Sequence, residues 1–343
     1  MVSAIEAAAF LSLAFFVPLF FTLGGLPPYL RWLVRRGKVS ADAHKSPPVK
    51  VPEPAGPILF LGALAGELFV FLVSRSLVPV AIILSTAAAF AIGLADDLYV
   101  LGGKTKPLLL VLAGLVFAAV VVMEPDLYTP VLFFPLLNDT SPHFTIFTLL
   151  AVAAFPVVSN AFNMMDSFNG EISWFTLLTS LALLAGVALR TAFTGFSIIR
   201  LGTDLPLVAV SGVFLLFNRY PSKAFDGDSG SLMFGAMFAG LAVTGGVEIA
   251  AIIAIVPAIL NSFYTLSSVK GFVERRRMKS RPTYLGEDGR MHASDDPGAP
   301  TTIIRLILLS GPLTERELVK EIVKLTAVAC VLSVIISVLT WVH

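Results

Sequence analysis

The feature that most constrains the fold is a series of about ten apolar runs that carry almost no charge. Hydrophobic residues make up 56% of the 343 residues and charged residues only 14%, whereas about a quarter of a soluble domain is charged. A helix that crosses a bilayer needs about 20 apolar residues. We therefore expect an all-α integral membrane protein, with one polytopic domain over residues 1–343. The expected spans lie near residues 4–30, 55–74, 77–95, 107–123, 144–163, 171–190, 204–218, 229–247, 248–270 and 318–341, and Pro257 breaks the ninth.

Positive charges fall on one side of this arrangement. If the first helix runs inward, all Lys and Arg residues except Arg75, Arg190 and Arg200 lie in cytoplasmic segments or at the helix ends beside them. Cytoplasmic segments of membrane proteins are enriched in Lys and Arg. The bias therefore predicts an even number of spans with both termini outside. The expected cytoplasmic segments are 31–54, 96–106, 164–170, 219–228 and 271–317.

Net charge, cysteine content and motifs exclude several classes of protein. The net charge of +1 argues against a nucleic-acid partner, because such proteins carry a strongly basic surface. The single Cys330 lies in the last apolar run, so neither a disulfide framework nor a thiolate metal site is expected. The sequence also has no Walker motif, dinucleotide fingerprint, zinc-ligand spacing or Ser-His-Asp order.

Two aspartates, Asp96 and Asp97, close the third expected span, and Lys104 and Lys106 follow them in a glycine-containing loop. One interpretation is a solvated acidic helix end, but acids at a helix C-terminus oppose the helix dipole. Neighbouring residues on a helix point about 100° apart, so one aspartate can meet a metal while the other meets a substrate. The lysines could pair with the aspartates or bind a phosphate.

Amide side chains gather at the end of the fifth expected span. Asn160 and Asn163 share one helix face, Asn163 and Asp166 do the same, and Asn169 follows. Such side chains could simply form hydrogen bonds between helices. Their number, on the side that also holds the aspartate pair, favours a polar site.

The segment Phe225-Asp226-Gly227-Asp228-Ser229-Gly230-Ser231 places Asp228 at the start of the eighth expected span. The segment lacks the closing glutamate of an EF-hand loop, which disfavours calcium storage. Carboxylate and amide oxygens suit a hard cation, Mg²⁺ or alternatively Mn²⁺. Acids, amides and bases at one membrane face suit phosphoryl transfer between a soluble nucleotide and a membrane lipid. A transporter is the remote alternative, because transport sites usually lie near the bilayer midplane.

A basic run at residues 275–281 opens the last large polar loop. It is either an ordinary positive-inside signal, a patch for anionic lipids, or a clamp for a diphosphate. The residues alone leave these alternatives open.

Three segments together, Ala95-Asp96-Asp97, Asn160-Ala161-Phe162-Asn163 and the one from Phe225 to Ser231, resemble the signatures of the polyprenyl-phosphate N-acetylhexosamine-1-phosphate transferases. The similarity is greatest to the eukaryotic and archaeal UDP-N-acetylglucosamine–dolichyl-phosphate N-acetylglucosaminephosphotransferases, because of segments 218–223, 261–264 and 311–316. The resemblance implies ten transmembrane helices and a cytoplasmic Mg²⁺ site. It also implies transfer of N-acetylglucosamine 1-phosphate from UDP-GlcNAc to a polyprenyl (dolichyl) phosphate, with release of UMP.

The resemblance also implies roles for individual residues. Asn163 and Asp228 match the metal ligands, and Asp96, Asp97 and Lys106 match the catalytic residues. The residues matched to substrate binding are Glu53 and Asn160 in the site, Asn169 and Phe225 at the uracil, and Arg277 and Lys279 at the diphosphate or sugar.

The chain departs from the family pattern beside Asn169. Ser167 stands where the eukaryotic enzymes have glycine, and Glu171 directly follows Gly170 where an apolar residue is usual. Another UDP-amino sugar, or an undecaprenyl phosphate carrier, therefore stays open as an alternative. The expected setting is N-glycan or surface-glycan synthesis in an archaeal-type plasma membrane rather than the endoplasmic reticulum, and a homodimer is left open.

Overall fold

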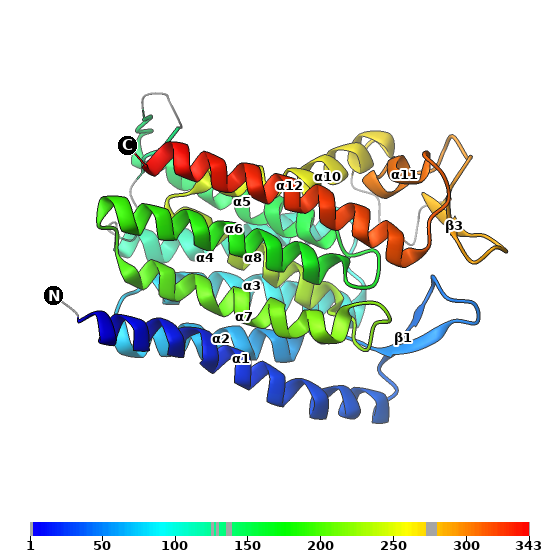
Figure 1. Cartoon of the computed structure of the whole chain (residues 1–343), viewed down its shortest axis with the longest axis horizontal. Coiled ribbons are helices and arrows are strands. Elements are labelled where there is room, and N and C mark those ends of the chain that lie inside the picture. The colour runs from blue at the N-terminus through cyan, green and yellow to red at the C-terminus, as the bar shows by residue number, and fades with distance from the viewer. Residues whose placement is uncertain (1–2, 125–126, 128–129, 135–138, 272–279, 343) are drawn as a thin grey trace.

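The computed structural model describes residues 3–124, 127, 130–134, 139–271 and 280–342, and this part of the chain forms a bundle of helices with two short hairpins at one end (Figure 1). The helices are α1 (Ala4–Arg35), α2 (Gly56–Ser74), α3 (Val78–Tyr99), α4 (Thr105–Met123), α5 (Phe144–Asn163), α6 (Glu171–Thr194), α7 (Ile198–Asn218), α8 (Gly227–Gly245), α9 (Glu248–Ala254), α10 (Val256–Ser268), α11 (Ile303–Leu308) and α12 (Glu315–Trp341). The strands are β1 (Val39–Asp42), β2 (Val49–Pro52), β3 (Thr283–Leu285) and β4 (Met291–Ala293).

Eight of the described helices, α1 to α7 and α12, are long and apolar enough to cross a membrane. The α9–α10 pair, which meets at 63°, adds one more if it is a single broken span. It breaks at Ile255, just ahead of Pro257, as the proline predicted. Helix α8 has 19 residues and a polar first turn. The all-α membrane class is thus confirmed. The expected number of about ten spans is reached only if α8 and the broken α9–α10 pair each count as one membrane span.

Helix α8 is the centre of the bundle. Every residue from Ser229 to Gly245 is buried, as expected for a helix enclosed by other helices rather than facing lipid. Small residues let its neighbours approach closely. A Cβ added at Gly235 would lie 2.6 Å from the Cα of Ser159 on α5, and one added at Gly93 on α3 would lie 2.4 Å from the carbonyl oxygen of Asp228. The ends of α3 and α5 are therefore held against the start of α8.

The two ends of the bundle differ. Both termini lie at one end, and the hairpins containing β1 and β3 lie with α11 at the other (Figure 1). Strand β1 pairs with β2 antiparallel, from Val39 opposite Pro52 to Asp42 opposite Val49. Strand β3 pairs with β4 in the same sense. Which end faces the cytoplasm stays a prediction. The sequence did not predict these hairpins, because strands of three or four residues leave no alternating pattern.

One helix boundary differs clearly from the expected one. Helix α7 begins at Ile198 rather than near residue 204. The expected span began after Arg200 because a charged residue is unusual inside an apolar span. In the structure, Arg200 and Asp204 are both buried within α7.

Candidate active site

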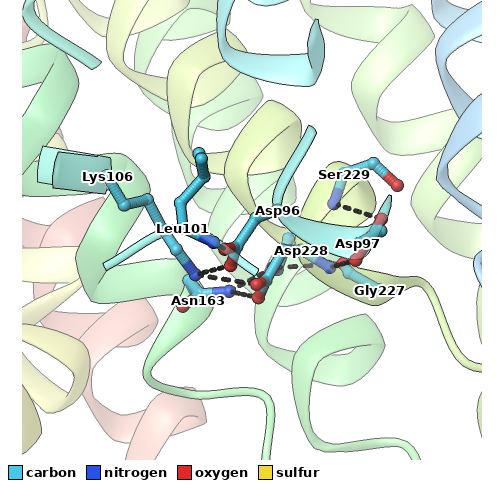
Figure 2. A network of polar contacts seen from close by, with 9 residues as sticks. Asp96, Asp97, Leu101, Lys106, Asn163, Gly227, Asp228 and Ser229 are labelled. Carbon is cyan, nitrogen blue, oxygen red and sulfur yellow. Dashed lines mark hydrogen bonds and ion pairs between the residues drawn. The ribbon is translucent and has the colours of Figure 1, made fainter. Parts of the chain in front are cut away.

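The aspartate at the end of α3 caps the start of α8. One carboxylate oxygen of Asp97 accepts a hydrogen bond from the backbone N–H of Asp228 at 2.7 Å, and the other accepts from Ser229 at 3.1 Å (Figure 2). Helix α8 has no side-chain cap from its own N-cap residue, Asp226. Unpaired N–H groups at a helix start need an acceptor, and a negative charge there also meets the positive end of the helix dipole. Asp97 therefore supplies from α3 the cap that α8 lacks.

A glycine lets this contact form. Gly227 has a φ of 71°, a left-handed conformation that a residue without a Cβ adopts freely. A Cβ at this position would lie 2.7 Å from Pro54 and 2.8 Å from a carboxylate oxygen of Asp97. The turn before α8 can pass between these two groups only with glycine there.

Lys106, in the first turn of α4, joins the other two carboxylates. Its Nζ lies 2.5 Å from Oδ2 of Asp96 and 2.7 Å from Oδ2 of Asp228 (Figure 2). The second oxygen of Asp96 accepts a hydrogen bond from the backbone of Leu101. Lys104, the other lysine singled out by sequence, is exposed. The expected pairing of a lysine with the aspartates is therefore present, and Lys106 makes it.

Asn163 completes the group from the end of α5. Its Nδ2 donates to Oδ1 of Asp228 at 2.5 Å and to Oγ of Ser231 at 2.9 Å. Asn160, one turn earlier, donates to the backbone carbonyl of Pro156 within its own helix. The carboxylate and carboxamide oxygens around Asp228 are the type of ligand that Mg²⁺ prefers. The donor set fits a hard divalent cation, and the structure brings Asn163 and Asp228 together, while their role as metal ligands stays a prediction.

These residues line one cavity of about 970 Å³. The sequence-predicted residues in its wall are Glu53, Asp96, Asp97, Lys106, Asn160, Asn163 and Asp228. The lining also includes large aromatic and aliphatic side chains, Tyr29, Trp32 and Leu33 from α1 and Leu94 and Leu98 from α3. The chain thus brings a charged centre and large apolar side chains into the same hollow, as a site for a lipid with a charged head requires.

Two predicted residues that the structure describes stand apart from this group. Asn169 and Phe225 are outside the described lining of the cavity. Arg277 and Lys279 lie outside the residues that the structure describes.

Asn169 belongs instead to a second polar group, which we call the β1–α12 cluster and which consists of Asp42, Lys45, Asn169 and Glu315. Asn169 donates from Nδ2 to Oδ2 of Asp42 at 2.9 Å and to Oε1 of Glu315 at 2.6 Å. Lys45 forms an ion pair with Glu315 and lies 3.5 Å from Asp42. Asp42, His44 and Glu315 are close enough together to share a cation, but the ammonium group of Lys45 already fills that role between the two carboxylates.

Sequence reasoning gave no role to Asp42 or Glu315. They lie 273 positions apart and in no shared motif, so only the fold brings them together.

Sequence reasoning also gave no role to Asp226. The side chain of Asp226 is fully buried and forms no hydrogen bond with another described residue. Burial raises the pKa of this carboxyl well above its ordinary value.

Comparisons with known proteins show the family of the chain. The model of glycosyl transferase family 4 matches residues 79–246, a stretch that includes Asp96, Lys106, Asn163 and Asp228. The chain is 30% identical over 283 residues to a protein of Methanocaldococcus jannaschii named as a glycosyltransferase, covering 82% of each chain.

Two further relatives have more specific names. A protein of Sulfolobus acidocaldarius named as a UDP-N-acetylglucosamine–dolichyl-phosphate N-acetylglucosaminephosphotransferase is 24% identical over 325 residues, which are 90% of this chain and 92% of the relative. A Bacillus subtilis protein named as an undecaprenyl-phosphate N-acetylglucosaminyl 1-phosphate transferase is 24% identical over 280 residues, which are 81% of this chain and 75% of the relative.

Proposed function

Because the chain belongs to glycosyl transferase family 4, we propose that it transfers N-acetylglucosamine 1-phosphate from UDP-GlcNAc to a polyprenyl phosphate, with dolichyl phosphate as the carrier. The observation that carries the proposal is the meeting of Asp96, Lys106, Asn163 and Asp228 in one cavity that large apolar side chains also line. The names of two relatives support the sugar nucleotide and the lipid carrier. The reaction would be a first membrane step of N-glycan or surface-glycan synthesis.

The reaction exchanges one phosphoanhydride bond for another. An oxygen of the lipid phosphate attacks the β-phosphorus of the sugar nucleotide, the bond from that phosphorus to the bridging oxygen breaks, and UMP leaves with this oxygen. A Mg²⁺ or Mn²⁺ ion held by Asn163 and Asp228 would offset the charge on the phosphates. Lys106, whose Nζ already lies between two carboxylates, adds a second positive charge beside the reacting groups.

The contacts of the two aspartates favour positioning over proton transfer. Both oxygens of Asp97 accept backbone N–H groups of α8, so this residue fixes where Asp228 stands. Asp96 is held by Leu101 and in turn holds Lys106. A phosphate monoester is already largely ionised near pH 7, so the acceptor needs no base. Correct placement of the reacting atoms can by itself lower the barrier by several kcal/mol, about 7 or more in well-oriented systems.

The acceptor's hydrocarbon chain would lie against the apolar side chains of the cavity, beside Trp32 and Leu98. Both side chains are about half exposed, which suits residues that meet lipid. The phosphate would then reach Lys106 from the membrane, while the nucleotide arrives from the aqueous side. We place this aqueous side in the cytoplasm of an archaeal-type cell.

The test is an assay of purified full-length protein with UDP-GlcNAc, dolichyl phosphate and Mg²⁺. The proposal requires lipid-linked product and UMP in equal amounts, and loss of both when the metal is chelated and recovery when Mg²⁺ or Mn²⁺ is restored. UMP without lipid product would contradict transfer to this acceptor.

The alternative is the same chemistry with another UDP-amino sugar or with undecaprenyl phosphate, and the name of the Bacillus subtilis relative favours the undecaprenyl carrier. Exchanging the donor and the lipid one at a time in this assay separates the alternatives. The pair with the highest kcat/KM identifies the substrates. Failure of every pair with folded protein would contradict the transferase function.

A further inference from the structure

The β1–α12 cluster fixes the orientation of the Asn169 amide. Its Nδ2 donates to Asp42 and to Glu315, at 2.9 and 2.6 Å, and its backbone N–H donates to the same oxygen of Glu315 at 3.0 Å. An ionised carboxylate can only accept hydrogen bonds. Turning the amide over would place its oxygen against two carboxylate oxygens, which costs both hydrogen bonds and adds repulsion. The amide is therefore held with its NH₂ group toward the carboxylates.

The rest of the cluster keeps the carboxylates in the role of acceptors. Lys45 forms an ion pair with Glu315 and lies 3.5 Å from Asp42, which suits two ionised groups. The side chains of Asp42 and Glu315 are each 5% exposed. Charge-assisted hydrogen bonds of this type are stronger than neutral ones.

The opposite atom of the amide has no such partner. Asn169 is 3% exposed, and its Oδ1 is buried without a hydrogen bond to any described residue. A buried acceptor without a donor loses the hydrogen bond it would make to water and destabilises the folded protein. The two preceding residues, Ser167 and Phe168, line the cavity, so Asn169 lies directly behind its wall. The oxygen is thus an acceptor behind the cavity wall for which no described residue supplies a donor.

We propose that Asp42 and Glu315 are positioning residues that hold Asn169 as a hydrogen-bond acceptor and thereby select the nucleobase of the donor. Uracil carries a hydrogen on ring nitrogen N3, whereas cytosine has a lone pair there. Oδ1 of Asn169, fixed in this way, accepts a hydrogen bond from N3–H of uracil. With cytosine, the lone pair of N3 would face the lone pair of Oδ1 and repel it. This inference rests on the proposed function and on the family resemblance that matches Asn169 to the uracil of the sugar nucleotide.

The test is binding of UDP and CDP to the full-length protein, for the wild type and for Glu315→Gln and Asp42→Asn. Each variant replaces one of the two carboxylates beside Asn169 with an amide that can donate as well as accept, which weakens the preference of the Asn169 amide for a single orientation. The wild type should prefer UDP, and the ratio of the two dissociation constants should fall about tenfold in each variant. Glu321→Gln is the control. It removes an exposed ion pair with Lys324 on the same helix and should leave the ratio of the two dissociation constants unchanged.

A merely structural role would not move this ratio. UDP methylated at N3 lacks the donor and should bind the wild type about tenfold more weakly than UDP. This measurement uses only the wild-type protein, so it does not depend on the folding of a variant. A wild-type preference that both variants retain, or equal binding of UDP and its N3-methyl form, would overturn the inference while leaving the proposed function in place. A wild type that binds no uridine nucleotide would contradict both.

Discussion

The two polar clusters beside the cavity differ in how the chain builds them. The proposed catalytic group, which consists of Asp96, Lys106, Asn163 and Asp228, lies at helix ends that meet around α8. The β1–α12 cluster draws on a short hairpin, a loop and the start of the last helix. The first group is held where helices of the bundle pack around α8, and the second by hydrogen bonds and an ion pair that join a hairpin and a loop to the start of α12. We expect the first to set the rate of reaction and the second to set the choice of nucleotide.

The largest expected effect comes from removing the aspartate at the start of α8. Asp228→Ala should lower turnover by about 1,000-fold or more, because it removes a metal ligand and the partner of Lys106. Turnover in the assay described above is the measurement. Asp226→Asn is a control from the same turn, since its side chain makes no hydrogen bond with another described residue. Near wild-type turnover in Asp228→Ala would contradict the assignment of Asp228 as a metal ligand.

Loss of the lysine should rank next. Lys106→Met removes the positive charge between Asp96 and Asp228 and should lower kcat by about 100-fold, the effect of deleting one group that stabilises a transition state. Lys104→Met changes the same residue type two positions earlier, where the side chain is exposed, and should have no effect. Equal losses in the two variants would indicate a general effect of surface charge instead.

A smaller loss is expected at the cap of α8. In Asp97→Asn, an NH₂ group replaces one of the two carboxylate oxygens. This donor then faces a backbone N–H of α8, which loses its hydrogen-bond acceptor. Stability should fall by about 1–2 kcal/mol, as for other N-cap losses, and kcat should fall about tenfold because Asp228 shifts. Ser3→Ala removes the cap of α1 at the other end of the bundle. It should cost stability without changing kcat, and a kcat change of the same size there would contradict a local role for Asp97.

The smallest effect should come from the ammonium group of the β1–α12 cluster. Lys45→Met removes the ion pair with Glu315 and should raise KM for the sugar nucleotide a few-fold while leaving kcat unchanged, because partly exposed ion pairs contribute only about 1 kcal/mol or less. Initial rates over a range of donor concentrations measure both constants. A loss confined to kcat would show that this cluster acts on the reaction rather than on the nucleotide.

The proposed catalytic group was predictable because its members lie in short, contiguous motifs at the ends of apolar runs. Asp96 and Asp97, Asn160 and Asn163, and Asp226 and Asp228 each mark one boundary. A boundary of this kind is visible from hydropathy alone, and helices of equal length bring their ends to the same level. The sequence could therefore predict a shared site without knowing how the helices pack.

The β1–α12 cluster was not predictable in this way. Asp42 and Glu315 occur singly among other charged residues of the polar segments, and nothing local distinguishes them. Their meeting depends on how a hairpin of four-residue strands folds over the bundle. The role of Asp97 as a cap for α8 depends in the same way on contacts between helices, which the spacing of residues does not reveal.

One comparison of variants tests the division between the two clusters most directly. It measures kcat and the UDP-to-CDP binding ratio side by side in Asp228→Ala and Glu315→Gln. The account predicts that Asp228→Ala loses kcat and keeps the preference for UDP, while Glu315→Gln keeps kcat within a few-fold and loses the preference. Loss of kcat in both variants with an unchanged ratio in both would contradict it, because the β1–α12 cluster would then support the fold and not the choice of nucleotide.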